Sequence, residues 1–253
     1  GGGDLLIRHK GEEYRSSLSS DYTVALEEYG PLRATLKASG WFRNQKGERF
    51  CQYVVRIQAF SGKSDVRLYH TFIYTGYPEN LYHHEYQNVK LPENETIEEI
   101  TVEGNFPLKG ELAYQVGLPQ QVLVEKLKAP LLLSQKSHET YQLLHGGKEI
   151  HAGKKASGWI HMASPGPGVS FHIRDFWQQF PKEILIDPTG KMKLSLWPLS
   201  AGPLNLETQD VAYGPDAVAR GSAFGLSKTH EIVFSFHEAP VDSQSLHSLA
   251  TAF

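Results

Sequence analysis

Apolar and polar residues alternate along most of this chain. In CQYVVRIQAF, Tyr53, Val55 and Ile57 fall on one face of an extended backbone while Gln52 and Arg56 fall on the other. This is the period-two pattern of a half-buried strand. The same kind of pattern runs through residues 22–30, 32–42, 64–76, 99–104, 110–117, 121–127, 158–163, 168–175, 191–198 and 228–238. The alternation therefore predicts many short strands.

Turn-forming sequences separate these segments. QKGER, FSGKSD, YTGYPEN, LPENET, HGGKE, SPGPG and DPTGK carry Gly, Pro or Asn where a chain reversal needs them. No stretch of helical period longer than a few turns interrupts the series up to residue 240. Short strands at this spacing indicate an all-β fold, an antiparallel sandwich or barrel, and not alternating strand–helix units.

Helical spacing occurs at the C-terminal end, in SQSLHSLATAF. Leu246, Leu249 and Phe253 share one helical face after a possible cap at Ser243. We therefore expect residues 1–20 to form a linker or entering strand, residues 21–240 to form one β-sandwich domain, and residues 241–253 to start a helical region.

Composition narrows the possible partners. The 253 residues fit one large β domain, and the net charge of −3 comes with 25 basic residues that are scattered along the chain. Scattered charge predicts no binding of nucleic acid or of an acidic membrane. Cys51 is the single cysteine, which excludes an internal disulfide and an all-cysteine metal site. No apolar run is long enough to span a membrane, and GGGDLLIRHKGEEY has neither an initiator Met nor a leader pattern.

Five segments in order carry a family resemblance. They are ALEEYGPLRATLKASGWF, VVRIQAFSGKSDVRLYHTFIYTG, FHIRDFWQQFPKEILID, KLSLWP and GLSKTHEIVFSF. In this order they resemble the central β-sandwich of the exo-rhamnogalacturonan lyase-like proteins, the PcRGLX/YetA-like group. The resemblance covers nearly the whole sandwich region, and RDFWQQFPKE, LWP and KTHE are its most specific pieces.

The resemblance implies a fold, a context and a substrate class. The fold is a large antiparallel β-sandwich of the galactose mutarotase-like supersandwich type. Members of the group also carry a small N-terminal barrel and a C-terminal α/α toroid, so both neighbours would be missing partners of this chain. The resemblance further implies an extracellular or periplasmic location, a polysaccharide or oligosaccharide partner and β-elimination on uronic-acid-containing glycans such as rhamnogalacturonan. We expect no cofactor, and without the toroid the domain is expected to be inactive.

Arg174 is a candidate for binding the carboxylate of a uronic acid. Elimination needs a cation at that carboxylate, a base and an acid for the leaving group. A guanidinium can hold a carboxylate through two parallel hydrogen bonds. The alternative is a structural ion pair of Arg174 with Asp175 or Glu183 that fixes the corner RDFWQQFPK. No residue of the chain can be assigned as the catalytic base from the sequence.

Trp197 is a candidate platform for a sugar ring. It alternates away from Met192, Leu194 and Leu196, which predicts a place on the sheet surface. Trp177, by contrast, shares parity with apolar residues of its strand, so we expect it to plug the core together with Phe180.

Lys228 and His230 continue the apolar face of KTHEIVFSFHE at the beginning of the strand. Cations at the edge of a core face extend to solvent, pair, or point into a cleft. A histidine there would donate to or accept from substrate, whereas the structural alternative is a hydrogen-bonded histidine at the rim of the core.

Other polar motifs are weak. His83, His84 and Glu85 are adjacent but match no metal-binding spacing, so no metal site is expected. Asn94 begins a glycosylation pattern, which matters only in a secreted eukaryotic chain.

Two further functions stay open at this stage. One is a non-catalytic carbohydrate-binding or scaffolding module. The other is a mutarotase-like sugar epimerase, which His161, His172 and His230 would serve if they shared a tight pocket. An open sheet face would instead favour the lyase-domain interpretation.

Overall fold

The computed structural model describes residues 2–76, 95–119, 121–206, 209–210, 219–220 and 223–238. Within them no helix is long and apolar enough to cross a membrane. The predicted helical segment 241–253, the His83–Glu85 group and Asn94 lie outside the described residues. The strands are β1 (Gly2–His9), β2 (Glu12–Arg15), β3 (Thr23–Tyr29), β4 (Arg33–Arg43), β5 (Arg49–Phe60), β6 (Asp65–Ile73), β7 (Glu99–Asn105), β8 (Ala113–Leu118), β9 (Gln121–Lys126), β10 (Leu131–Ser137), β11 (Thr140–His145), β12 (Lys148–Gly153), β13 (Trp159–Ala163), β14 (Gly168–Ile173), β15 (Lys182–Ile186), β16 (Lys191–Trp197), β17 (Gln209–Asp210), β18 (Ala219–Arg220) and β19 (Ser227–His237), with two short 3₁₀ turns at Ser16–Leu18 and Leu199–Ala201.

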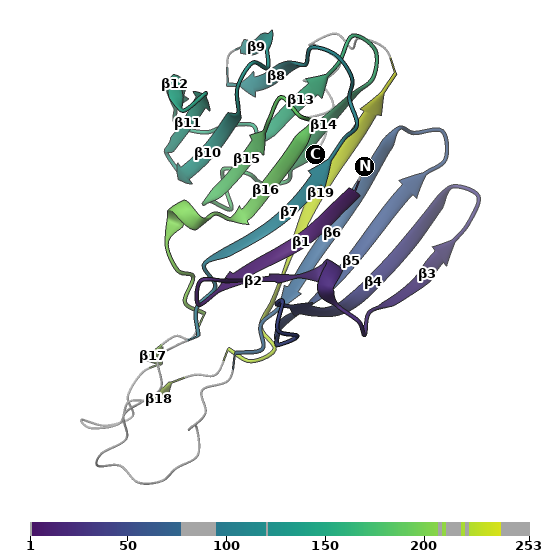
Figure 1. Ribbon diagram of the computed structural model, residues 1–253, viewed down its shortest axis with the longest axis vertical. Coiled ribbons are helices and arrows are strands. Elements are labelled where there is room, and N and C mark those ends of the chain that lie inside the picture. The colour runs from purple at the N-terminus through teal and green to yellow at the C-terminus, as the bar shows by residue number, and fades with distance from the viewer. Residues whose placement is uncertain are drawn as a thin grey trace.

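Seventeen of these strands form two antiparallel series that lie face to face (Figure 1). The first, here called the β1 sheet, has the order β2-β1-β7-β16-β15-β10-β11-β12. The second, here called the β19 sheet, has the order β3-β4-β5-β6-β19-β14-β13-β8-β9. One residue pair, Arg15 with Arg43, joins them. The predicted all-β, large antiparallel β-sandwich is confirmed.

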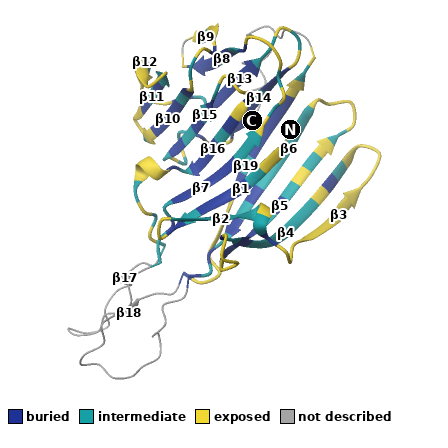
Figure 2. Ribbon diagram, in the orientation of Figure 1, coloured by how far each residue is buried: buried dark blue, intermediate teal, exposed yellow. Residues whose placement is uncertain are grey.

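The core lies between the inner faces of the two sheets, as the dark blue strands of Figure 2 show. In the β1 sheet, Val102 pairs with Leu194, and in the β19 sheet, Phe171 pairs with Phe234. All four are buried in one apolar cluster. Both sheets therefore bury the apolar side of their alternation, as a sandwich requires.

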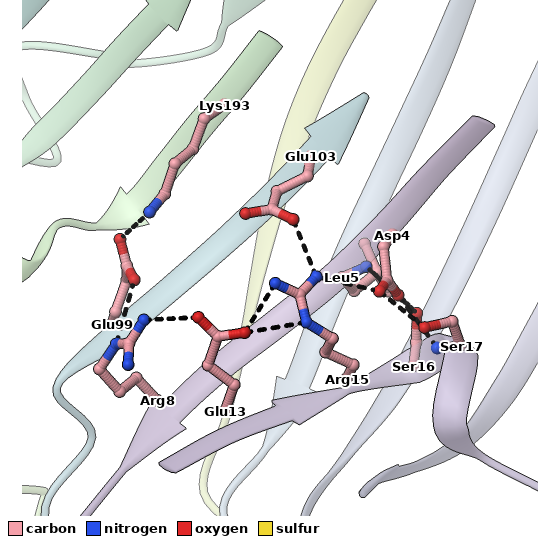
Figure 3. Close-up of polar contacts among 10 residues, drawn as sticks. All are labelled: Asp4, Leu5, Arg8, Glu13, Arg15, Ser16, Ser17, Glu99, Glu103 and Lys193. Atoms are coloured by element: carbon pink, nitrogen blue, oxygen red, sulfur yellow. Dashed lines mark hydrogen bonds and ion pairs between the residues drawn. The ribbon is translucent and has the colours of Figure 1, made fainter. Parts of the chain in front are cut away.

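The outer face of the β1 sheet carries an ion-pair network (Figure 3). The Arg15 guanidinium contacts Glu13 at 2.7 Å, Glu103 at 2.9 Å and Asp4 at 3.2 Å. Glu13 also accepts from Arg8 at 2.6 Å. Because these residues come from β1, β2 and β7, the network ties the first 15 residues into the sheet.

Phe176 fills the core at the corner RDFWQQFPK, so our expectation for Trp177 and Phe180 was wrong. Phe176 is 1% exposed, Trp177 is half-buried and Phe180 is exposed. The chain leaves the strand at Ile173 and turns, with Asp175 at a φ of 54°. The strand parity that pointed Trp177 inward therefore does not continue through the corner, and Trp177 instead lies under the Lys155 ammonium, 4.0 Å from its ring.

Candidate functional site

Four basic side chains gather on the inner faces where β19 begins. His70 and His230 are opposite one another in the β6–β19 pair, and Lys228 lies two residues before His230. Lys182 comes from the facing sheet, at the first position of β15. Each occupies the apolar side of its strand, so burial of that side brings the bases together. We call these four residues the basic cluster.

The two histidines of the basic cluster are buried and neutral at pH 7. Burial lowers the pKa of His70 to about 4. Burial also lowers the pKa of His230, to about 2, and repulsion from Lys182, His70 and Lys228 adds to that effect. The amines of Lys182 and Lys228 therefore lie close enough to His230 to disfavour its protonation.

Lys182 is the member whose charge can change near neutral pH. Burial, followed by repulsion from Lys228, lowers its pKa to about 7. Its Nζ donates a hydrogen bond of 2.9 Å to the Leu196 carbonyl oxygen. Near pH 7 this amine therefore gains or loses a proton readily while one of its hydrogen bonds stays fixed by the backbone.

Hydrogen-bonding capacity is unused in this cluster. Within the described part of the chain, the two ring nitrogens of His70 have no hydrogen-bond partner. The same is true of Nδ1 of His230. A buried polar atom without a partner costs free energy, so each such atom needs an explanation. A ligand that accepts or donates hydrogen bonds would satisfy them.

Trp197 packs against the core and does not lie on the sheet surface, so that prediction was wrong. A β-bulge shifts the register between Ser195 and Trp197, and Trp197 then pairs with Ile100. The extra residue turns the indole to the core side, where it is partly buried against the apolar cluster. Its Nε1 donates to the Gly202 carbonyl oxygen at 2.8 Å.

Arg174 lies on the opposite face of the β19 sheet from His230. It is half-exposed, and its Nη1 donates to Glu231 Oε2 at 2.8 Å. Its partner is thus Glu231 and neither Asp175 nor Glu183, although the structural ion-pair alternative is correct in kind. Glu231 is nearly buried and also faces Arg67 at 3.4 Å.

The three histidines named for an epimerase do not share a pocket. His161 accepts from or donates to Ser170 Oγ at 3.0 Å on the outer face of the β19 sheet. His172 lies on that same outer face, between the buried Phe171 and Ile173, whereas His230 is on the inner face. The tight one-sheet sugar pocket that would favour an epimerase is therefore not formed by these residues.

His70 and Lys182 are the members of the cluster that the sequence interpretation missed as site residues. The sequence carried a signal for both residues. His70 shares a strand face with Leu68 and Phe72, and Lys182 shares a strand face with Ile184. A base at an otherwise apolar position of a strand is the feature that marks both. Among the described residues, no group of three or more His, Cys, Asp or Glu side chains could hold a metal ion.

A family and two solved structures are similar to this chain. The family described as PcRGLX-like protein central beta sandwich domain matches residues 8–82 and 133–251. No curated protein matches the sequence. An alpha-mannosidase from Enterococcus faecalis V583 is similar with a TM-score of 0.56 at 9% identity, over 99% of this chain and 27% of that one. The alpha-N-acetylgalactosaminidase NagBb from Bifidobacterium bifidum is similar with a TM-score of 0.50 at 10% identity, over 100% of this chain and 33% of that one. At these identities the likeness shows the fold alone, and this chain spans a third or less of either solved chain.

Proposed function

The chain belongs to the PcRGLX-like family, whose central beta sandwich domain it forms, and on that premise we propose that it serves a polysaccharide lyase. The substrate is a uronic-acid-containing glycan such as rhamnogalacturonan, and the reaction is β-elimination. The domain acts in an extracellular or periplasmic setting, where such glycans occur, and together with the other domains of a longer protein.

The basic cluster is the observation that supports this proposal. A uronic acid differs from a neutral sugar by its carboxylate, and a carboxylate binds best to cationic donors in a partly desolvated site. Lys228 is exposed, His230 is nearly buried, and Lys182 and His70 lie deeper. The cluster thus extends from the exposed Lys228 to buried ring nitrogens that have no hydrogen-bond partner among the described residues.

The chemistry assigns the cluster a charge-neutralising role. In β-elimination a base removes the proton from the carbon beside the carboxylate, the bond to the 4-linked oxygen breaks, and a carbon–carbon double bond forms. Negative charge develops on the carboxylate in the transition state, so nearby cations lower the barrier. Lys228 and a protonated Lys182 supply that charge, while the base and the acid come from an adjoining domain.

Binding of the carboxylate should be linked to proton uptake. An anion beside Lys182 and His230 favours their charged forms and raises pKa values that burial has lowered. Affinity should therefore rise as the pH falls from about 8 to 6, through the pKa of about 7 that Lys182 has without ligand. A neutral sugar should show no such dependence.

Isothermal titration calorimetry with galacturonate oligosaccharides and their carboxyl-reduced counterparts tests the proposal. We expect the uronate to bind more tightly, and Lys228→Ala and His230→Leu to weaken that preference by about tenfold each. Arg174→Gln, which removes a cation from the opposite face, is the matched control and should leave it unchanged. Equal affinity for charged and reduced oligosaccharides would refute the proposal.

Activity separates a lyase domain from a binding module. The longer protein should release the ultraviolet-absorbing unsaturated product from rhamnogalacturonan, and residues 1–253 alone should not. If the longer protein binds the uronate and never forms that product, the domain is a carbohydrate-binding module.

A further inference from the structure

The β19 sheet extends beyond the β1 sheet, and among the described residues nothing covers part of its inner face. Along β5 the exposed fraction rises from 5% at Tyr53 to 37% at Ile57, although both side chains point to the same face. On the outermost strand, β3, Val24 and Leu26 are 54% and 58% exposed. Figure 2 shows the same change, from blue and teal on the inner strands to yellow on β3.

This uncovered face is apolar and continuous. Leu26 of β3 pairs with Leu36 of β4, Leu36 pairs with Ile57 of β5, and Ile57 pairs with Leu68 of β6. Four neighbouring strands thus present aliphatic side chains in one row. Soluble proteins rarely leave such a row open, because an apolar sheet face is stable only when another layer covers it.

The row leads into an open crevice between the two sheets, with a volume of about 570 Å³. The β1 sheet contributes Leu5, Val102 and Met192 to it, and the β19 sheet contributes Ile57 and Phe236. We call the row and this crevice together the apolar mouth. It is distinct from the basic cluster, which lies toward the other end of β6 and β19.

The two ends of the described part of the sandwich lie at the apolar mouth. Gly2, the first described residue, lines the crevice, and so does Phe236, two residues before the last described one. Both ends of the described part of the sandwich therefore lie beside the uncovered face.

We propose that an apolar surface of an adjoining domain of the same polypeptide covers the apolar mouth. The matching family is described as a central domain. The two solved chains with this fold are three or more times as long as this chain, which spans 27% and 33% of them. A tethered domain has a high effective concentration at a face next to its own linker. This favours the adjoining domain over a second copy of the chain.

Thiol labelling of two neighbouring positions on β3 tests the proposal in the longer protein. Leu26→Cys faces the apolar mouth and Ala25→Cys faces away, yet both positions are exposed in the sandwich alone. Covering of the mouth should make a maleimide react with Leu26→Cys about tenfold or more slowly than with Ala25→Cys under native conditions. Cys51 is buried, so the parent sequence gives a low background.

Equal labelling rates at the two positions would overturn the proposal. So would protection of Leu26→Cys that is present only in a dimer and lost on dilution to a monomer, as followed by light scattering, because a second copy would then be the occupant. Both variants replace exposed side chains, and a circular dichroism spectrum equal to that of the parent confirms that each is folded.

Discussion

The two ends of β19 show how one strand face serves two purposes. At its start the inner face carries Lys228 and His230, and at its finish it carries Phe234 and Phe236. Between them Ile232 is fully buried. The face is therefore continuous in geometry but changes from basic to aromatic along its length.

The difference teaches that burial and function are separate properties of a core face. The basic end is buried although its groups are polar, which makes it costly and therefore informative. The aromatic end is partly exposed although its groups are apolar, which is also costly in water. In a simple sandwich, apolar groups are buried and polar groups are exposed. The basic end buries polar groups and the aromatic end exposes apolar ones, so each end marks a place where a ligand or another domain would bind.

The largest effect is expected from truncating the aromatic end at two neighbouring inward positions. Phe234→Ala should lower the free energy of unfolding by about 3–5 kcal/mol, because the ring is buried against Phe171, with 5.9 Å between the two ring centroids. Phe236→Ala should cost about 1 kcal/mol or less, because that side chain is 43% exposed. Urea denaturation of both variants measures the contrast, and equal losses would show that the mouth is already closed within the chain.

Acid should destabilise the basic end. The pKa of His70 is about 4 in the fold against a usual 6.5, so between these values the unfolded chain binds more protons than the folded one. Stability should then fall as the pH drops from 6.5 to 4, by on the order of 3 kcal/mol for this residue.

Replacement of the histidine checks that origin. His70→Leu should remove most of its share of the acid loss, whereas His138→Gln, on an exposed turn, should not. Urea midpoints across the pH range are the measurement. An unchanged pH profile in His70→Leu would place the acid sensitivity elsewhere.

Lys182→Met should show an effect whose sign depends on pH. The pKa of Lys182 is about 7 in the fold against a usual 10.5, so its contribution to stability grows as the pH rises between these values. Above about pH 10.5, where the amine is neutral in both the folded and the unfolded chain, the variant should lose about 1–2 kcal/mol through the missing hydrogen bond to Leu196. At pH 6, where the native amine must be buried with its charge, the loss should shrink or reverse. A pH-independent loss would mean that the pKa of the Lys182 amine is the same in the folded and the unfolded chain.

Arg174→Lys should have the smallest effect. The arginine forms a half-exposed ion pair with Glu231, and such pairs contribute under about 1 kcal/mol. In the longer protein, turnover should also be unchanged, because Arg174 lies on the other face from the basic cluster. A large loss of turnover with an unchanged melting temperature would restore Arg174 to the site.

Several parts of the fold were predictable and others were not. Alternation identified β3 to β9, β13, β14, β16 and β19, since a sheet with one buried face requires period two. It did not single out β1, β2, or β10 to β12, where apolar residues run together, as in Leu131 to Leu133, or the strand is short. The bulge before Trp197 and the turn after Ile173 each break parity, so face predictions failed just beyond them.

The sequence by itself determined the all-β class, the family and the buried face of the strands with regular alternation, because these depend on local alternation and on ordered motifs. Tertiary structure decided which faces meet. It placed Lys182 from β15 near His230, and within the described residues it left the outer strands of the β19 sheet without a covering layer. Both results depend on contacts between residues far apart in the chain. A local sequence pattern does not show which distant segments come together.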